Sequence, residues 1–106
     1  MAFSYRGRCY MAMQEYKRGL YDFSAAIRAE QKKENRDVKS DENLSEFYLY
    51  AGQCNHMLGQ FEEAILHYNF AYEKNKDSAE VLFHRGQSHV AINAFHEGIK
   101  DFMQAE

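Results

Sequence analysis

The stretch YLYAGQCNHMLGQFEEAILHYNFAY, residues 48–72, decides the fold of this chain. Its apolar residues recur at intervals of three and four, which places them on one face of a helix. Leu58, Gly59 and Gln60 interrupt this pattern and leave room only for a tight turn. Because a turn this short joins antiparallel neighbours, the stretch predicts a helical hairpin.

The same pattern returns after this stretch at one constant offset, and an earlier copy precedes it. The three copies read Gly7, Met13, Tyr16, Gly19, Leu20, Phe23, Ala26; Gly52, Leu58, Phe61, Ala64, Ile65, Tyr68, Ala71; and Gly86, Ile92, Phe95, Gly98, Ile99, Phe102, Ala105. The first two copies lie further apart than the last two, which places an insertion of eleven residues, 34–44, at the first junction. Repetition at a fixed period is typical of stacked structural repeats.

The repeated glycines predict close helix packing. Gly7, Gly52 and Gly86 fall in the middle of the first helix of each hairpin, where glycine costs about 1 kcal/mol relative to alanine. We expect the missing side chain to let a bulky residue of the second helix approach. Small residues at positions 19, 64 and 98 give the second helix a matching site.

This unit resembles the tetratricopeptide repeat, a helical hairpin of about 34 residues in which a Gly is followed by an aromatic, a small residue, a second aromatic and an Ala. The resemblance implies an all-α domain over residues 1–106, a right-handed superhelical stack of three hairpins with six helices. Repeat 1 is expected at 1–33, an extended junction at 34–44, repeat 2 at 45–78 and a truncated repeat 3 at 79–106. The chain departs from the pattern because it has no proline, with Lys76 at the closing position, and because Phe3, Tyr48 and Leu82 stand at the tryptophan-type site.

The charged insertion is predicted either to prolong the preceding helix from Glu30 through Arg36 or to form a loop. Ser40 or Asp41 is the expected cap of the next helix, and Ser78 the expected cap before the third unit.

Two charged positions vary together between the units. Arg6 and Asp22 in the first unit correspond to Arg85 and Asp101 in the third, whereas the second unit has neither charge. This covariation predicts a bidentate contact across each of the two hairpins.

The cysteines occupy one repeat position, and no pattern of a catalytic or metal site is present. Cys9 and Cys54 are predicted to be two buried free thiols, since helices about 10 Å apart are too distant for a disulfide. The five histidines form no zinc motif, and no phosphate loop occurs. We therefore expect no metal, no cofactor and no enzyme activity.

The bulk composition excludes further classes. The net charge is −3 without a basic cluster, so nucleic acid is not an expected partner. No run of about 18 apolar residues predicts a membrane span, and no targeting segment precedes the first helix, which favours a cytoplasmic location.

A protein or peptide partner is expected on the concave face formed by the first helices of the hairpins. The register places these residues there: Arg8, Met11, Leu49, Gln53, His56, Phe83 and Gln87, with Ser4 and Val90 beside them. One subclass of the family grips chaperone C-terminal tails through basic and amide side chains. The corresponding positions here are Ser4, Arg8, Tyr50, Glu80 and His84, so that partner is not expected.

An alternative is a structural segment of a larger scaffold. No polar capping helix follows the last repeat up to Glu106. Because solenoids need covered ends, the uncapped end predicts either further repeats or self-association.

Overall fold

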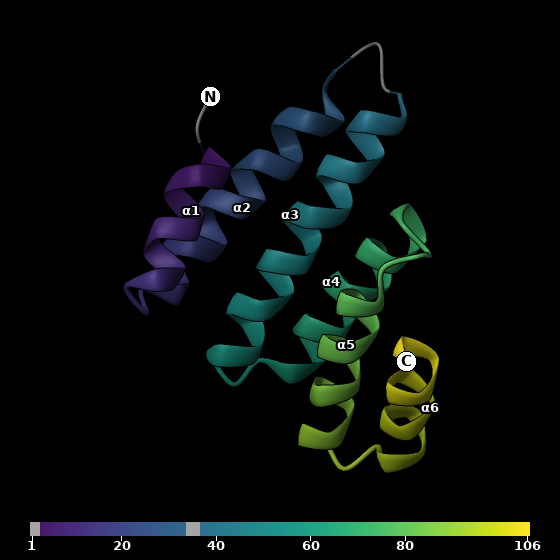
Figure 1. Cartoon of the computed structure of the whole chain (residues 1–106). Coiled ribbons are helices and arrows are strands. Elements are labelled where there is room, and N and C mark those ends of the chain that lie inside the picture. The colour runs from purple at the N-terminus through teal and green to yellow at the C-terminus, as the bar shows by residue number, and fades with distance from the viewer. Residues whose placement is uncertain (1–2, 34–36) are drawn as a thin grey trace.

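The computed structural model describes residues 3–33 and 37–106, and within these ranges it contains six helices and no strand. The helices are α1 (Phe3–Ala12), α2 (Tyr16–Gln31), α3 (Val38–Met57), α4 (Phe61–Lys74), α5 (Ala79–Ala91) and α6 (Phe95–Ala105). They pair as three antiparallel hairpins, which confirms the all-α architecture predicted from the repeat (Figure 1).

The hairpins form a stack that runs from α1 at one end to α6 at the other (Figure 1). α3 packs against α2, and α5 packs against α4. The first helix of each following hairpin therefore packs against the second helix of the hairpin before it. α3 also touches α1 and α5, which brings the first helices of all three hairpins together. The smallest extent of the Cα trace, 19 Å, accommodates two layers of helices about 10 Å apart.

The mid-helix glycines lie where the prediction placed them, against the second aromatic of each hairpin. A Cβ atom at Gly52 would sit 2.5 Å from Cε1 of Tyr68, and one at Gly86 would sit 2.7 Å from Cε1 of Phe102. At Gly7 the nearest atom would be Cζ of Phe23 at 3.0 Å. The small residues therefore set the distance between the two helices of each hairpin.

All three hairpin turns use a left-handed residue at the same repeat position. The φ angles are 62° at Gln14, 77° at Gly59 and 64° at Asn93. Glycine and asparagine adopt this conformation readily, whereas glutamine does so at a cost. The turn geometry is thus common to the three units even though the residue that forms it differs.

The insertion contributes to a longer helix pair at the first junction. α3 begins at Val38, and its N-cap is Asp37, whose Oδ1 accepts a hydrogen bond of 3.0 Å from the backbone N of Ser40. The prediction that Ser40 or Asp41 caps this helix was wrong, because a cap three residues earlier is available. α2 ends at Gln31, and residues 34–36, including Arg36, lie outside the described ranges. Ser78 does cap α5, as predicted.

A buried carboxylate holds this lengthened pair together. Glu30 on α2 is 5% exposed and accepts hydrogen bonds from Asn43 on α3 at 3.3 Å and from Lys33 at 2.9 Å. Burial by itself raises the pKa of Glu30, but hydrogen bonds from Lys33, Asn43 and Ser40 outweigh it and hold the pKa below its ordinary value. The polar residues of the insertion therefore bind the preceding helix.

The predicted ion pairs span both hairpins that carry them. Arg6 donates to Asp22 at 2.9 and 2.8 Å, and Arg85 donates to Asp101 at 3.0 and 2.7 Å. Both contacts are bidentate, and both carboxylates are almost fully buried. In the second hairpin, which lacks the charges, His67 forms a hydrogen bond to Asn55 instead.

The two cysteines differ in exposure, so the prediction of two buried thiols was half wrong. Cys54 on α3 is fully buried, where it lies 3.3 Å from a Cβ position at Gly19 of the preceding hairpin. Cys9 occupies the same place on α1 and is exposed. The cause is that no described hairpin precedes α1 to cover this position.

Candidate functional site

The first helices present polar and apolar residues in one register. Residues three and four apart on a helix share a face, so Glu46, Tyr50, Gln53 and Met57 form a row on α3. The corresponding rows run through positions 5, 8 and 12 on α1 and 80, 84 and 87 on α5. Two adjacent hollows lie along these rows.

The first hollow, which we call the histidine pocket, has a volume of about 250 Å³. Its lining comes from five helices and consists of Met11, Tyr16, Gln53, His56, Met57, Tyr68 and His84. None of these side chains is Lys, Arg, Asp or Glu. Their aromatic and thioether groups favour an apolar side chain as the occupant.

Hydrogen bonds and ring contacts fix the walls of the histidine pocket. His56 Nδ1 and the fully buried Ser88 hydroxyl are 2.9 Å apart. The His84 ring stacks on Tyr68 with centroids 6.2 Å apart, and Tyr68 is itself 1% exposed. Because its walls are anchored on three hairpins, the pocket is formed before any ligand arrives.

The second hollow, the acidic groove, lies between α3 and α5 and has a volume of about 350 Å³. It is lined by Glu42, Ser45, Glu46, Leu49, Tyr50, Asn75, Ser78, Glu80 and Val81. Three carboxylates thus face one hollow whose lining contains no Lys or Arg. Tyr50 also lines this groove, and burial together with the charge of Glu46 raises the pKa of its phenol.

Arg8 lies next to the acidic groove. Its guanidinium carbon is 5.7 Å from the centroid of the Tyr50 ring. With Lys39 and Glu46 it lines a third hollow of about 320 Å³ between α1 and α3. The charges along the face of α1, α3 and α5 therefore change from mixed near α1 to acidic between α3 and α5.

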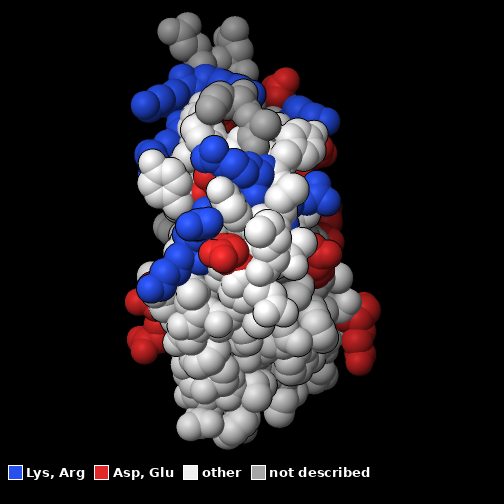
Figure 2. Space-filling view, turned by 90° about the vertical axis from the view of Figure 1, so that its left-hand side faces the viewer, with Lys and Arg blue, Asp and Glu red and all other residues white. Residues whose placement is uncertain are grey.

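The turn end of the second and third hairpins is uncharged. Residues 53–61 and 86–96 contain no Lys, Arg, Asp or Glu. Figure 2 shows the result on the side that carries α1: basic residues gather on the upper part, and the lowest part has no charged residue. The histidine pocket opens near this uncharged end, since Met57 and His56 belong to it.

The seven residues expected on the concave face fall into four environments. Met11, Gln53 and His56 meet in the histidine pocket, and Arg8 stands in the hollow beside the acidic groove. Phe83 and Gln87 are exposed on α5, with Phe83 facing the outer side of the last hairpin.

The expectation that Leu49 is exposed was wrong. It is 5% exposed because Val81 of the next hairpin packs on it, together with Tyr68 and Ala71. Only the small exposed part of the Leu49 side chain lines the acidic groove. A substitution of this residue would test stability and not binding.

Sequence reasoning missed four lining residues of the histidine pocket. Tyr68 and Tyr16 belong to the packing pattern of the repeat, and Met57 and His84 carry no motif. For Met57 and His84 the available signal was the helix row that contains Gln53. Met57 belongs to this row on α3, and His84 occupies the repeat position of Tyr50, which belongs to it as well.

Two histidines make stability dependent on pH. Burial and the proximity of His84 lower the pKa of His56. Burial also lowers the pKa of His67, although Glu63 opposes the shift. A folded-state pKa below the unfolded value means that the unfolded chain binds the proton more readily. This contribution to stability is complete above the unfolded pKa of about 6.5 and is lost as the pH falls through the folded pKa.

We therefore expect the free energy of unfolding to decrease between about pH 7.5 and pH 5.5. The double variant His56→Gln/His67→Gln should lose most of this slope in urea titrations at a series of pH values. The exposed His96 provides the control, since His96→Gln should leave the slope unchanged. An unchanged slope in the double variant would show that other groups titrate.

The described residues contain no group of three or more His, Cys, Asp or Glu side chains that could hold a metal ion. None of their helices is both long and apolar enough to cross a membrane.

No protein-family model and no curated protein matches this sequence. Among solved structures, the chain is similar to the first TPR of Spaghetti (RPAP3) bound to HSP90 peptide SRMEEVD, with a TM-score of 0.84 and 15% identity over 98% of this chain and 74% of that chain. It is also similar to the second TPR of Spaghetti (RPAP3) bound to the same peptide, with a TM-score of 0.81 and 13% identity over 98% of this chain and 86% of that chain. The chain therefore has a tetratricopeptide-repeat fold, as the repeat pattern predicted.

Proposed function

We propose that this protein is a non-catalytic interaction module that binds an extended peptide on the face of α1, α3 and α5. The observation that carries the proposal is the histidine pocket, an uncharged hollow to which all three hairpins contribute. A repeat needs only its own packing residues to fold, so a preformed hollow with exposed Met57 in its wall is available for a ligand.

The neighbouring charges define the ligand further. A peptide that places an apolar side chain in the histidine pocket and continues along the stack reaches Glu46 and Glu80 in the acidic groove. Lys or Arg at that point of the ligand would be favoured by opposite charge. We therefore propose a ligand with a basic residue adjacent to an apolar anchor.

The peptide bound by the two similar structures has the opposite character. SRMEEVD contains three acidic residues. In this chain such a peptide would meet Glu42, Glu46 and Glu80, and like charges in a groove disfavour binding. The shared fold and the groove thus support peptide binding. The proposed preference for a basic ligand rests instead on the carboxylates of this chain.

Selection from a randomised peptide library tests the proposal. The wild-type protein should enrich peptides in which Lys or Arg stands near an apolar residue. The variant Glu46→Lys/Glu80→Lys should lose that preference and gain affinity for a synthetic SRMEEVD peptide. The substitution Met57→Glu places a charge in the histidine pocket and should weaken the selected peptides at least about tenfold.

The matched control is Leu66→Glu on α4, because Leu66 is 58% exposed and Met57 is 57% exposed. This variant should bind as the wild type does. Selected peptides that bind Met57→Glu and wild type equally would contradict the proposed site, and a selection without basic residues would contradict the role of the acidic groove.

A further inference from the structure

Both junctions between hairpins are built from the same contacts. The first helix of each following hairpin presents an aromatic ring to the buried aromatic of the hairpin before: Tyr50 stacks on Phe23 with centroids 5.2 Å apart, and His84 on Tyr68 at 6.2 Å. One turn further, a small residue is fully buried in the junction. This residue is Cys54 in the first junction and Ser88 in the second.

The two ends of the stack carry the two halves of this junction uncovered. On α1, Tyr5 stands at the position of Tyr50 and is 69% exposed, and Cys9 stands at the position of Cys54 and is exposed. On the last hairpin, Phe102 stands at the position of Tyr68, and Phe83 at the position of Leu49. Phe83 is 47% exposed, whereas Leu49, covered by α5, is 5% exposed.

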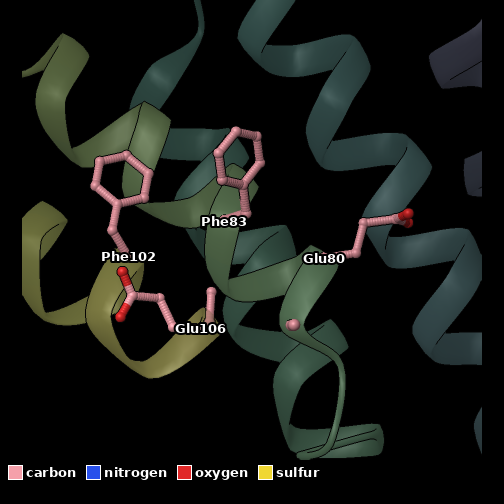
Figure 3. A pocket seen from close by; sticks show the side chains of 6 residues that line it. Glu80, Phe83, Phe102 and Glu106 are labelled. Carbon is pink, nitrogen blue, oxygen red and sulfur yellow. The ribbon is translucent and has the colours of Figure 1, made fainter.

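The uncovered half on the last hairpin forms a hollow of about 480 Å³, lined by Ala79, Glu80, Phe83, Phe102, Ala105 and Glu106. Figure 3 shows the rings of Phe83 on α5 and Phe102 on α6 side by side, with Glu106 on the same side and Glu80 pointing away from the rings. The ring centroids are 5.8 Å apart. Ile99 and Met103 extend this apolar surface along α6, since both are more than half exposed.

We infer that α1 of a second copy of this chain docks on the outer face of α5 and α6 and continues the stack head to tail. The docked helix places Tyr5 on Phe102 of the neighbouring copy, as Tyr50 lies on Phe23 within the chain. Cys9 is then enclosed between the copies, as Cys54 is between the first two hairpins.

The charges at the two ends are complementary. Residues 1–33 contain seven Lys or Arg and three Asp or Glu, whereas residues 79–106 contain two and four. Figure 2 shows the basic residues gathered over the α1 end of the molecule. Opposite net charges favour contact between unlike ends over contact between like ends.

One pair of positions makes this complementarity specific. At the second junction, Arg85 lies over the Tyr72 ring at 5.2 Å and donates to Asn69 at 3.0 Å. In the register of the repeat, Arg6 takes the place of Arg85, and Glu106 takes the place of Tyr72. The contact between copies thus sets an arginine opposite a carboxylate.

A contact between unlike faces does not close on itself. Each added copy leaves one free α1 and one free last hairpin, so association continues into longer arrays. This distinguishes the arrangement from a symmetric dimer, in which both copies use the same face.

Two single substitutions block one face each. Cys9→Lys places a long charged side chain where the junction encloses only Cys54 or Ser88. Met103→Lys places a like charge beside the docked Arg6, because Met103 stands at the position of Asn69, which bonds to Arg85. Each should weaken association at least about tenfold, since both leave an ammonium group unpaired in the contact.

Sedimentation equilibrium over a range of concentrations, in the presence of a reductant, measures the result. The wild-type mass should rise with concentration without stopping at a dimer, and each variant alone should remain monomeric. An equimolar mixture of Cys9→Lys and Met103→Lys should form a dimer and nothing larger, because one intact α1 and one intact last hairpin remain. Tyr21→Lys and Leu66→Lys should behave as wild type, since both lie at the repeat position where the third hairpin already carries Lys100.

Alkylation of the thiols gives a second readout on the wild-type chain. The rate at Cys9 should fall as the protein concentration rises, whereas Cys54 should stay unreactive because burial raises its pKa to about 12. A wild-type chain that stays monomeric would overturn the inference. A wild-type mass that stops at a dimer, a mixture of the two variants that stays monomeric, or association that leaves Cys9 equally reactive would do the same.

Discussion

Replacing Gly52 by leucine should lower the free energy of unfolding by at least about 3 kcal/mol. A Cβ atom at this position would sit 2.5 Å from Cε1 and 2.7 Å from Cδ1 of Tyr68. Tyr68 is 1% exposed and packs in a buried cluster with Leu49 and Val81, so its ring cannot move away from α3 without breaking these contacts. The larger leucine side chain would force the two helices of the hairpin apart. Urea denaturation followed by circular dichroism measures the loss.

Alanine substitutions at two equivalent glycines provide the control. An alanine gains about 1 kcal/mol of helix propensity over glycine wherever it fits. At Gly7 the nearest contact is the far end of the Phe23 ring at 3.0 Å, so Gly7→Ala should be close to neutral. Gly52→Ala should destabilise despite the same gain. Equal effects at the two sites would show that the contact with Tyr68 does not set the helix spacing.

The substitution Arg85→Met should destabilise the chain by about 3–5 kcal/mol. It removes both hydrogen bonds to Asp101, which is 4% exposed, and leaves that carboxylate buried without its cationic partner. The double variant Arg85→Met/Asp101→Leu removes the buried charge as well and should recover most of the loss. Chemical denaturation of both variants gives the comparison.

An exposed ion pair serves as the reference for this effect. Arg18 and Glu15 are 3.8 Å apart, and both side chains are largely exposed. Arg18→Met should change the stability by less than about 1 kcal/mol. His89 Nε2 also lies 3.5 Å from Asp101 Oδ2, so a similarly small effect for Arg85→Met would mean that His89 or water compensates the Asp101 carboxylate.

The sequence predicted most of the fold because the repeat depends on local spacing. Residues three and four apart share a helix face, and a three-residue turn forces an antiparallel pair, so each hairpin follows from positions within a single repeat. The pairing of Arg6 with Asp22 was also predictable, since both residues belong to one hairpin and vary together with Arg85 and Asp101.

The candidate site was predicted only in part. Met11, Gln53 and His56 share the histidine pocket because they occupy the expected register of the first helices. Tyr16, Tyr68 and His84 complete it from other helices, and their arrival depends on how neighbouring hairpins dock. The acidic groove has the same origin, since Glu46 and Glu80 belong to successive repeats and meet only when α5 packs beside α3.

The amino-acid sequence by itself determined the helices, the turns and the residues that pack within each hairpin, because these contacts are short in sequence and repeat with a fixed period. Only the tertiary structure decided which positions are covered. Leu49 and Phe83 occupy one repeat position, as do Cys54 and Cys9, yet the first of each pair is buried and the second exposed. The physical reason is that burial at these positions is supplied by the adjacent hairpin, and the two ends of the described stack each lack one.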